Sequence, residues 1–437
     1  MNRIFYAMVV IAFLVAAVRQ VQWEPPPVDV TVEDAVPVQS PMEELTDGMI
    51  KAAKSSVDLA ISLIGMMALF LGLMKVAEKG GALRVMAKLL RPAMIRLFPD
   101  VPPDHPAMGA MILNFSANAL GLGNAATPFG IRAMQELDKL NSHRGTATNS
   151  MALFLAINTS SITILPTGVI GIRAAMNSND PAGIMGPTLF ATLCSTTVAI
   201  LACKTYQRFA PVTQETDVPT EQDHQPHVDV DIETSEAYPT WVSIAVFAGI
   251  IGLVPVTLVW GTIVAPWIIP AIMLGLLSFG FFRGVPVYEV FVEGAKEGFE
   301  IAVKIIPYLV AILVAVGMVR ASGALGAFVG LLGPLTGPLG LPAEALPMAL
   351  IRPLSGSGAM GVMMSTMEAN GVDSYVGYLV STLQGSTETT FYVLAVYFGA
   401  VQVRRIRHAM AAALTADAAG IVGAVAGVWL YITFSGL

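Results

Sequence analysis

Long apolar segments recur along the chain, and they limit its possible folds more than any other feature of the sequence. A helix needs about 20 mostly apolar residues to span a membrane. Only 13% of the residues are charged, whereas soluble domains carry roughly 25%. Nine segments are candidate spans: residues 5–18, 57–77, 151–172, 186–203, 241–260, 265–282, 305–319, 378–400 and 411–434. The sequence therefore predicts an all-α polytopic membrane protein with about nine transmembrane helices.

The basic residues predict an orientation, because Lys and Arg favour the cytoplasmic ends of spans. Six of them lie between residues 75 and 96, whereas the loop at 20–47 has none. We therefore expect the N-terminus inside, that loop outside and the C-terminus outside. The segment 5–18 is as short as a signal peptide, but the sequence VAAVRQVQ has no convincing small-residue cleavage site, so we expect a membrane anchor. This orientation requires that the polar stretch at 114–128 and its later counterpart do not complete a crossing.

The polar stretch NFSANALGLGNAATP, at residues 114–128, interrupts the apolar sequence. Apolar residues flank it on both sides, so we expect it to enter the membrane region and turn back, or to form a broken helix. Irregular backbone at membrane depth persists only where it is buried in protein or lines a wet cavity. Its polar side chains Asn114, Ser116, Asn118, Asn124 and Thr127 are therefore predicted to bind a substrate. The alternative is that they satisfy the broken backbone and hold helices together.

The chain repeats itself at an offset of 242 residues. AKSSVDLAISL then aligns with AKEGFEIAVKI, and eight of the 31 positions from 53 to 83 are identical to their copies. Further along, NFSANAL corresponds to PLSGSGA, and NTSSIT corresponds to QGSTET. Under the predicted orientation, 57–77 and its copy 305–319 cross in opposite directions. We therefore predict an inverted internal repeat with two re-entrant or broken segments, NFSANALGLGNAATP and RPLSGSGAMG, that approach each other near the membrane midplane.

Three further polar clusters complete the predicted substrate site. They contribute Asn158 and Ser160, then Arg352, Ser355 and Ser357, then Gln384, Ser386, Thr387 and Glu388. A charge at membrane depth needs an opposite charge, water or a ligand. We expect Glu388 to face the bundle interior, with Arg352, the polar breaks or water beside it. The alternative is a buried pair of Arg352 and Glu388 that contacts no substrate, and Asp417 is either a proton-coupling acid or a helix-packing residue.

The acidic, polar segment 206–240 is predicted to be a disordered cytoplasmic linker. It divides the chain into a half at 1–205, with the anchor helix and the first repeat, and a half at 241–437 with the second repeat. His224 and His227 lie among the carboxylates of the linker and are interpreted as solvated side chains rather than metal ligands.

The sequence contains no motif that is typical of a catalytic site. It has no phosphate-binding glycine motif with a lysine, no histidine cluster in the spans and no Ser–His arrangement. We therefore expect a protein that is not an enzyme and that holds neither a cofactor nor a metal. The breaks offer amides and hydroxyls with one acid, and such oxygen ligands suit hard cations better than ferrous iron.

Two long motifs resemble known families. NFSANALGLGNAATPFGIRAMQELDKLN resembles the signature of spore maturation protein A. RPLSGSGAMG, together with LQGSTETTFYVLAVYFGAVQVRRIRHAM, resembles that of spore maturation protein B. The chain is thus similar to a fusion of both, except at the linker. The resemblance implies that each half has a nucleoside recognition (gate) domain, which is similar to parts of concentrative nucleoside transporters and ferrous-iron permeases. It also implies a multi-pass protein of the cell inner membrane, with a role in spore core dehydration and cortex maturation in spore formers.

The function expected from the residues and the resemblance together is that of a transporter or flux protein. Its solute is small and polar, either nucleoside-like or related to the cell envelope. The alternative is a scaffold that does not transport and that assists envelope or peptidoglycan maturation. The expected partners are the solute and the lipid bilayer, with homo-oligomerisation left open. The modest net charge of −7 does not indicate a nucleic-acid partner.

Overall fold

The computed structural model describes residues 2–24, 39–121, 123–211 and 238–435, and these residues form helices joined by short connections. No strand occurs among them, so the predicted all-α class is confirmed. The linker at 206–240, with His224 and His227, and the loop at 20–47 lie largely outside the described residues. The helices in chain order are α1 Asn2–Val21, α2 Pro41–Lys79, α3 Ala82–Leu97, α4 Pro106–Ala119, α5 Gly123–Lys139, α6 Asn149–Ser160, α7 Thr167–Ala175, α8 Met185–Tyr206, α9 Thr240–Val259, α10 Gly261–Phe282, α11 Val287–Ala321, α12 Ala324–Thr336, η1 Gly337–Leu339, η2 Ala343–Ala345, α13 Leu346–Ile351, α14 Gly356–Asn370, α15 Tyr375–Ser386, α16 Thr390–Gly399 and α17 Ala409–Ser435.

Four helices in the described part of the chain are long and apolar enough to cross a membrane. They are α2, α8, α17 and, within α9, Thr240–Thr257. A fifth crossing is possible if Leu309–Ala321 and Ala324–Leu339, which meet at 77°, form one bent span. The predicted count of nine spans is therefore not confirmed. The predictions of continuous helices at 151–172 and 378–400 are wrong, because each segment is broken in its middle into two short helices.

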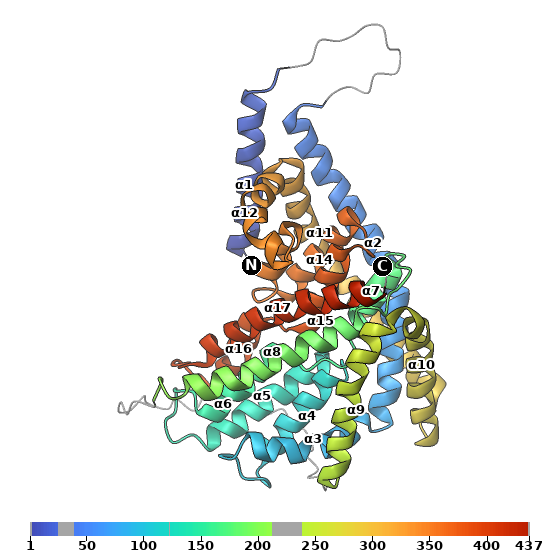
Figure 1. Cartoon of the computed structure of the whole chain (residues 1–437), viewed down its shortest axis with the longest axis vertical. Helices are drawn as coiled ribbons and strands as arrows, with labels where there is room; N and C mark the ends of the chain where they lie inside the picture. Colours follow the sequence, from blue (N-terminus) through green and yellow to red (C-terminus); the bar gives the residue numbers. More distant parts are fainter. Residues whose placement is uncertain (1, 25–38, 122, 212–237, 436–437) are drawn as a thin grey trace.

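The two longest helices, α2 and α11, pack against each other in opposite directions. A Cβ atom at Gly48, near the start of α2, would lie 2.6 Å from Cβ of Ala321, at the end of α11. One at Gly72, near the end of α2, would lie 2.8 Å from the ring of Phe291. Glycine permits such close backbone approach, which helix packing in lipid uses in place of a hydrophobic driving force. In Figure 1 this helix pair runs along one side of the molecule, and α1 stands beside its upper end.

Helices α8 and α17 form a second antiparallel pair, which runs across the middle of the molecule (Figure 1). A Cβ atom at Gly427 would lie 3.1 Å from Pro187, at the start of α8. One at Gly420 would lie 3.4 Å from Ser195, further along α8. The pair has an apolar core toward each of its ends, and each core takes side chains from both halves of the chain. In one of them Phe154 of the first half lies with its ring centroid 5.9 Å from that of Tyr397.

The helix bounds repeat between the two halves. Helices α6 and α15 each have 12 residues, and each begins after a hydroxyl cap, Thr148 or Ser374, whose side chain accepts a backbone N–H two or three residues into the helix. Helices α3 and α12 start 242 residues apart, each after a left-handed glycine, Gly81 (φ 85°) or Gly323 (φ 81°). Glycine tolerates this conformation at little cost. Helices α2 and α11 also end 242 residues apart, at Lys79 and Ala321, so this pair joins corresponding segments of the two halves.

Candidate solute site at the crossing of two broken helices

Two broken helices, one from each half, meet at their breaks. The first ends at Ser160 and resumes at Thr167, after Ser161 takes up a left-handed backbone conformation (φ 45°). The second ends at Ser386 and resumes at Thr390 through three extended residues. The Glu388 N–H donates to the Thr159 carbonyl (2.9 Å). Each break frees backbone donors and acceptors, and this bond satisfies one of each.

The two broken helices run in opposite directions through this crossing. At one end, just before α6, the Ala147 N–H donates to the carbonyl of Arg405, which follows α16 (2.9 Å). At the other end, Arg173 at the end of α7 pairs with Asp373, just before α15 (2.9 Å). The start of each broken helix therefore lies against the end of the other.

Arg352 connects the RPLSGSGAMG segment to the second break. Its guanidinium donates to the Thr387 carbonyl and to the Thr389 hydroxyl (3.2 Å), and only 6% of the residue is exposed. Glu388 lies 3.8 Å away, so the predicted neighbour is confirmed. The expectation that Glu388 faces the bundle interior is not met, because 43% of its side chain is exposed. Glu388 lies in the break itself, between the end of α15 at Ser386 and the start of α16 at Thr390.

The NFSANALGLGNAATP stretch forms a hairpin of α4 and α5, with Gly121 (φ 76°) in the turn. Asn118 on α4 donates to Asn158 Oδ1 beside the first break (3.0 Å). Asn114 is fully buried and donates to the Ala126 carbonyl across the hairpin (2.8 Å) and to the Tyr397 hydroxyl (3.2 Å). Hydrogen bonds thus link this hairpin to the first break and to α16, while RPLSGSGAMG is linked to the second break. The described hydrogen bonds contain none that joins the two segments directly.

The remaining predicted site residues have different surroundings. Ser116 is buried, but its hydroxyl bonds to the Ile112 carbonyl of its own helix (2.7 Å). Ser355 caps α14 by accepting from the Gly358 N–H (3.0 Å). Thr127 is half-buried on α5, and Ser357 is exposed. The side chain of Asn124 lies outside the described residues.

Helix α8 contributes hydroxyls that the sequence reading missed. Thr192 donates to the carbonyls of Ser160 (3.3 Å) and Ser161, and Thr196 shares a hydrogen bond with the Ser160 hydroxyl (3.0 Å). Thr188, Thr192 and Thr196 recur every four residues and Ser195 follows Thr192 by three, which places them toward one face of α8. That spacing indicates a polar helix face, but the segment 186–203 is so apolar overall that its sequence predicts only a membrane span.

Several buried polar atoms near the crossing have no hydrogen-bond partner among the described residues. They are Thr188 Oγ1, Thr382 Oγ1, Gln384 Oε1, Ser386 Oγ and Asp417 Oδ1. The other carboxylate oxygen of Asp417 accepts from the Thr390 hydroxyl at the start of α16 (2.7 Å). Buried polar groups in proteins are nearly always hydrogen-bonded, so such a set needs water or a ligand. The crossing therefore offers hydroxyls, an amide and a carboxylate, with the Arg352 cation nearby.

A network of buried polar side chains lies where the end of α7 meets the start of α15. Arg173 is fully buried and donates to the Val372 carbonyl (2.8 Å), and its guanidinium stacks 4.2 Å from the ring centroid of Tyr378. The hydroxyls of Tyr378 and Tyr431 both donate to Asp180 (2.9 and 2.5 Å). The sequence reading named none of these residues, because they are far apart in the chain and no local pattern joins them.

Comparison with known proteins identifies the domain that both halves share. The Gate family, described as nucleoside recognition, matches residues 60–176 and again residues 302–404, together about half of the chain. The chain belongs to the Gate family. The two matches start 242 residues apart, so the repeat read from the sequence is a repeat of this domain, and each break of the crossing lies in its own copy.

Two curated relatives divide the chain between them. It is 46% identical over 160 residues to spore maturation protein A of Bacillus subtilis (strain 168), which is 37% of this chain and 82% of that protein. It is 50% identical over 157 residues to spore maturation protein B of the same organism, which is 36% of this chain and 88% of that protein. The predicted membership in a fused spore maturation protein A/B family is thereby confirmed, and with it a multi-pass membrane location. No solved structure matches the chain.

Proposed function

We propose that this Gate-family protein moves a small polar solute across the membrane, with the crossing of the two broken helices as its binding site. The observation that carries the proposal is the crossing itself. It gathers backbone groups freed by two helix breaks and at least five buried polar atoms without a protein partner in the described residues. In membrane proteins such irregular, polar backbone lines cavities and ion or solute paths.

We infer further that the two halves are inverted copies that rock against each other around this site. Three observations support this: α2 and α11, α8 and α17, and the two broken helices each pair equivalent elements in opposite directions. Secondary transporters built from inverted repeats bind their solute between the repeats and expose it to each side in turn. In this proposal the halves are residues 1–205 and 241–437, and the membrane is the cell inner membrane.

The solute class follows from the donors and acceptors. Hydroxyls, the amides of Asn118 and Gln384 and a single nearby cation suit a neutral or singly charged molecule with several hydroxyl or amide groups, such as a nucleoside or a cell-wall precursor. The Gate description as nucleoside recognition favours the first, and the relatives, named spore maturation proteins, favour a solute that is used in spore maturation.

The test uses full-length protein in liposomes, screened for uptake of nucleosides, cell-wall precursors and small anions. Ser386→Ala removes a buried hydroxyl that has no described protein partner, so we expect unchanged melting temperature and at least tenfold lower uptake. The matched control is Thr433→Ala, whose exposed hydroxyl bonds only to its own helix. No protein-dependent uptake of any compound would contradict the proposal.

The second candidate is a scaffold without transport. The Arg173 network favours it, because there a buried cation and its partners hold the two halves together. Under this reading the polar atoms at the crossing are structural. Ser386→Ala should then lower protein abundance and sporulation-related function in proportion, whereas the transport proposal predicts lost function at constant abundance.

A further inference from the structure

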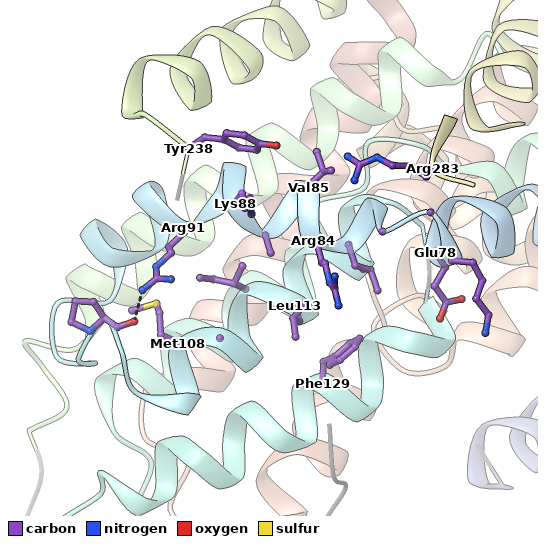
Figure 2. A pocket seen from close by; sticks show the side chains of 18 residues that line it. Glu78, Arg84, Val85, Lys88, Arg91, Met108, Leu113, Phe129, Tyr238 and Arg283 are labelled. Carbon is purple, nitrogen blue, oxygen red and sulfur yellow. Dashed lines mark hydrogen bonds between the residues drawn. The ribbon is translucent and has the colours of Figure 1, made fainter. Parts of the chain in front are cut away.

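A second candidate site lies away from the crossing, in a cavity of about 770 Å³ between α3, the α4–α5 hairpin and the ends of α9 and α10 (Figure 2). Its size falls in the range of pockets that hold small ligands, roughly 300–1,000 Å³. Five cationic side chains line it, Lys79, Arg84, Lys88, Arg91 and Arg283, against one carboxylate, Glu78. Arg91 also pairs with Asp104 (3.1 Å), but the cations still outnumber the carboxylates around the cavity.

Two of these cations lie against aromatic rings, and neither forms an ion pair with a carboxylate in the described part of the chain. Lys88 lies 5.9 Å from the ring centroid of Tyr238, and Arg283 lies 5.3 Å from that of Phe279. Figure 2 shows Lys88 and Arg283 on either side of Val85, and the Arg84 side chain points toward Phe129. Cations that line one cavity repel one another, so this arrangement favours the binding of an anion among them.

The second copy of the domain shows that the fold does not need these charges. Helix α12 starts 242 residues after α3 and keeps its leucines and proline, with Leu89, Leu90 and Pro92 matched by Leu331, Leu332 and Pro334. The three cations of α3 that line the cavity, Arg84, Lys88 and Arg91, correspond to Gly326, Gly330 and Gly333. The same helix therefore forms with no charge on this face, and the cations of α3 serve another purpose.

The opposite wall of the cavity is apolar. Leu83, Met108, Ile112, Leu113 and Phe129 line it, and the cavity lies where the long apolar helices α2 and α10 end. A membrane helix ends at the headgroup level, so the cationic side lies at the depth of lipid phosphates and the apolar side at the depth of acyl chains. The pocket thus fits an anion with an attached apolar part.

We propose that this cavity binds a phosphate group with net negative charge, from the headgroup of an anionic lipid or from a soluble phosphate ester. Arginine and lysine together match phosphate oxygens through forked and point-charge hydrogen bonds. Basic pockets between membrane helices are known to hold anionic headgroups. The site is separate from the crossing and does not depend on the proposed transport.

The test measures retention of phosphatidylglycerol and phosphatidylcholine on the purified full-length protein by native mass spectrometry. Thermal stability is titrated in parallel with inorganic phosphate and with glycerol phosphate. We expect phosphatidylglycerol to be retained at least tenfold more than phosphatidylcholine, whose phosphate is neutralised by choline. Lys88→Gln, Arg283→Gln and the double variant should each weaken this retention, whereas the control Lys51→Gln/Lys54→Gln, which removes two exposed cations of α2, should not.

The outcomes separate the two sources of phosphate. Selective retention of phosphatidylglycerol that soluble phosphates do not displace assigns the site to a lipid headgroup. Stabilisation by soluble phosphates that is lost in the Lys88 and Arg283 variants assigns it to a soluble ester. Equal retention of both lipids with no stabilisation by phosphate would overturn the proposal. So would cavity variants that fold and bind as the wild type does.

Discussion

Arg352 and Glu388 have different surroundings although they lie only 3.8 Å apart. The guanidinium of Arg352 is almost fully buried, and its two terminal nitrogens bond to one hydroxyl and one carbonyl of the break without help from Glu388, while its Nε has no hydrogen-bond partner among the described residues. The Glu388 carboxylate is half-exposed, and exposed ion pairs contribute only about 0–1 kcal/mol to stability. At the scale of single residues, Arg352 is therefore structural, and Glu388 is available to a solute or proton.

Glu388→Gln should accordingly separate stability from function. We expect the variant to fold with a melting temperature within a few degrees of the wild type, because a half-exposed pair contributes about 0–1 kcal/mol. Uptake of the transported solute should fall at least tenfold, because the charge in the break is gone. Uptake and thermal melting of the same preparation check this. A variant that is normal in both would show that Glu388 has no role at the site.

Arg352→Gln should instead act on stability. The shorter amide cannot reach both the Thr387 carbonyl and the Thr389 hydroxyl, and an orphaned buried polar group costs about 1–3 kcal/mol. We expect a lower melting temperature and a lower yield of folded protein. Ser357→Ala, a change at an exposed residue of the same segment, is the control and should behave as the wild type. An Arg352→Gln protein as stable as the control would contradict the structural role.

At the scale of whole elements, the α2–α11 pair depends on glycines at close backbone contacts. A Cβ atom at Gly298 of α11 would lie 2.7 Å from the Met67 carbonyl oxygen of α2. Backbone cannot move aside as a flexible side chain does, so the helices themselves would have to separate.

Gly298→Val should therefore destabilise the protein by about 1–3 kcal/mol, the usual cost of overpacking. The matched control is Gly330→Val on α12, where an added Cβ atom has no neighbour within 4 Å. Both variants place the same side chain in a membrane helix, so their difference in melting temperature isolates the contact with α2. Equal stability of the two would mean that α2 and α11 are not in close contact.

At the scale of the whole molecule, the inverted repeat predicts that equivalent turns face opposite sides of the membrane. Lys79 at the end of α2 and Ala327 at the start of α12 are both exposed near the equivalent turns at Gly81 and Gly323. We expect Lys79→Cys to react with an impermeant thiol reagent from the cytoplasmic side only, and Ala327→Cys from the outside only. Cys194 and Cys203 are replaced by Ala in the background. Labelling of both positions from one side would rule out inverted halves.

The sequence alone determined the class of the protein and its duplication, whereas the two breaks of the crossing fall within segments that it predicted as whole spans. Apolar segments of spanning length indicate a membrane protein. The sequence identities between the two copies, at an offset of 242 residues, indicate that both copies form similar helices. The first break could be anticipated from Ser161 to Pro166, because a proline interrupts helical hydrogen bonding. Features that depend on neighbouring residues, such as apolar segments and a helix-breaking proline, can be predicted from a single sequence.

Only the tertiary structure decided how these parts meet. The second break contains no proline, and its backbone departs from a helix because partners elsewhere, Thr159, Arg352 and Pro353, satisfy the freed groups. The contacts of Arg173 with Asp373 and of Asn118 with Asn158 also depend on the tertiary structure, because the members of each pair are distant in the chain. A spacing pattern records which face of one helix is polar, but which partner covers that face depends on the packing of all the others.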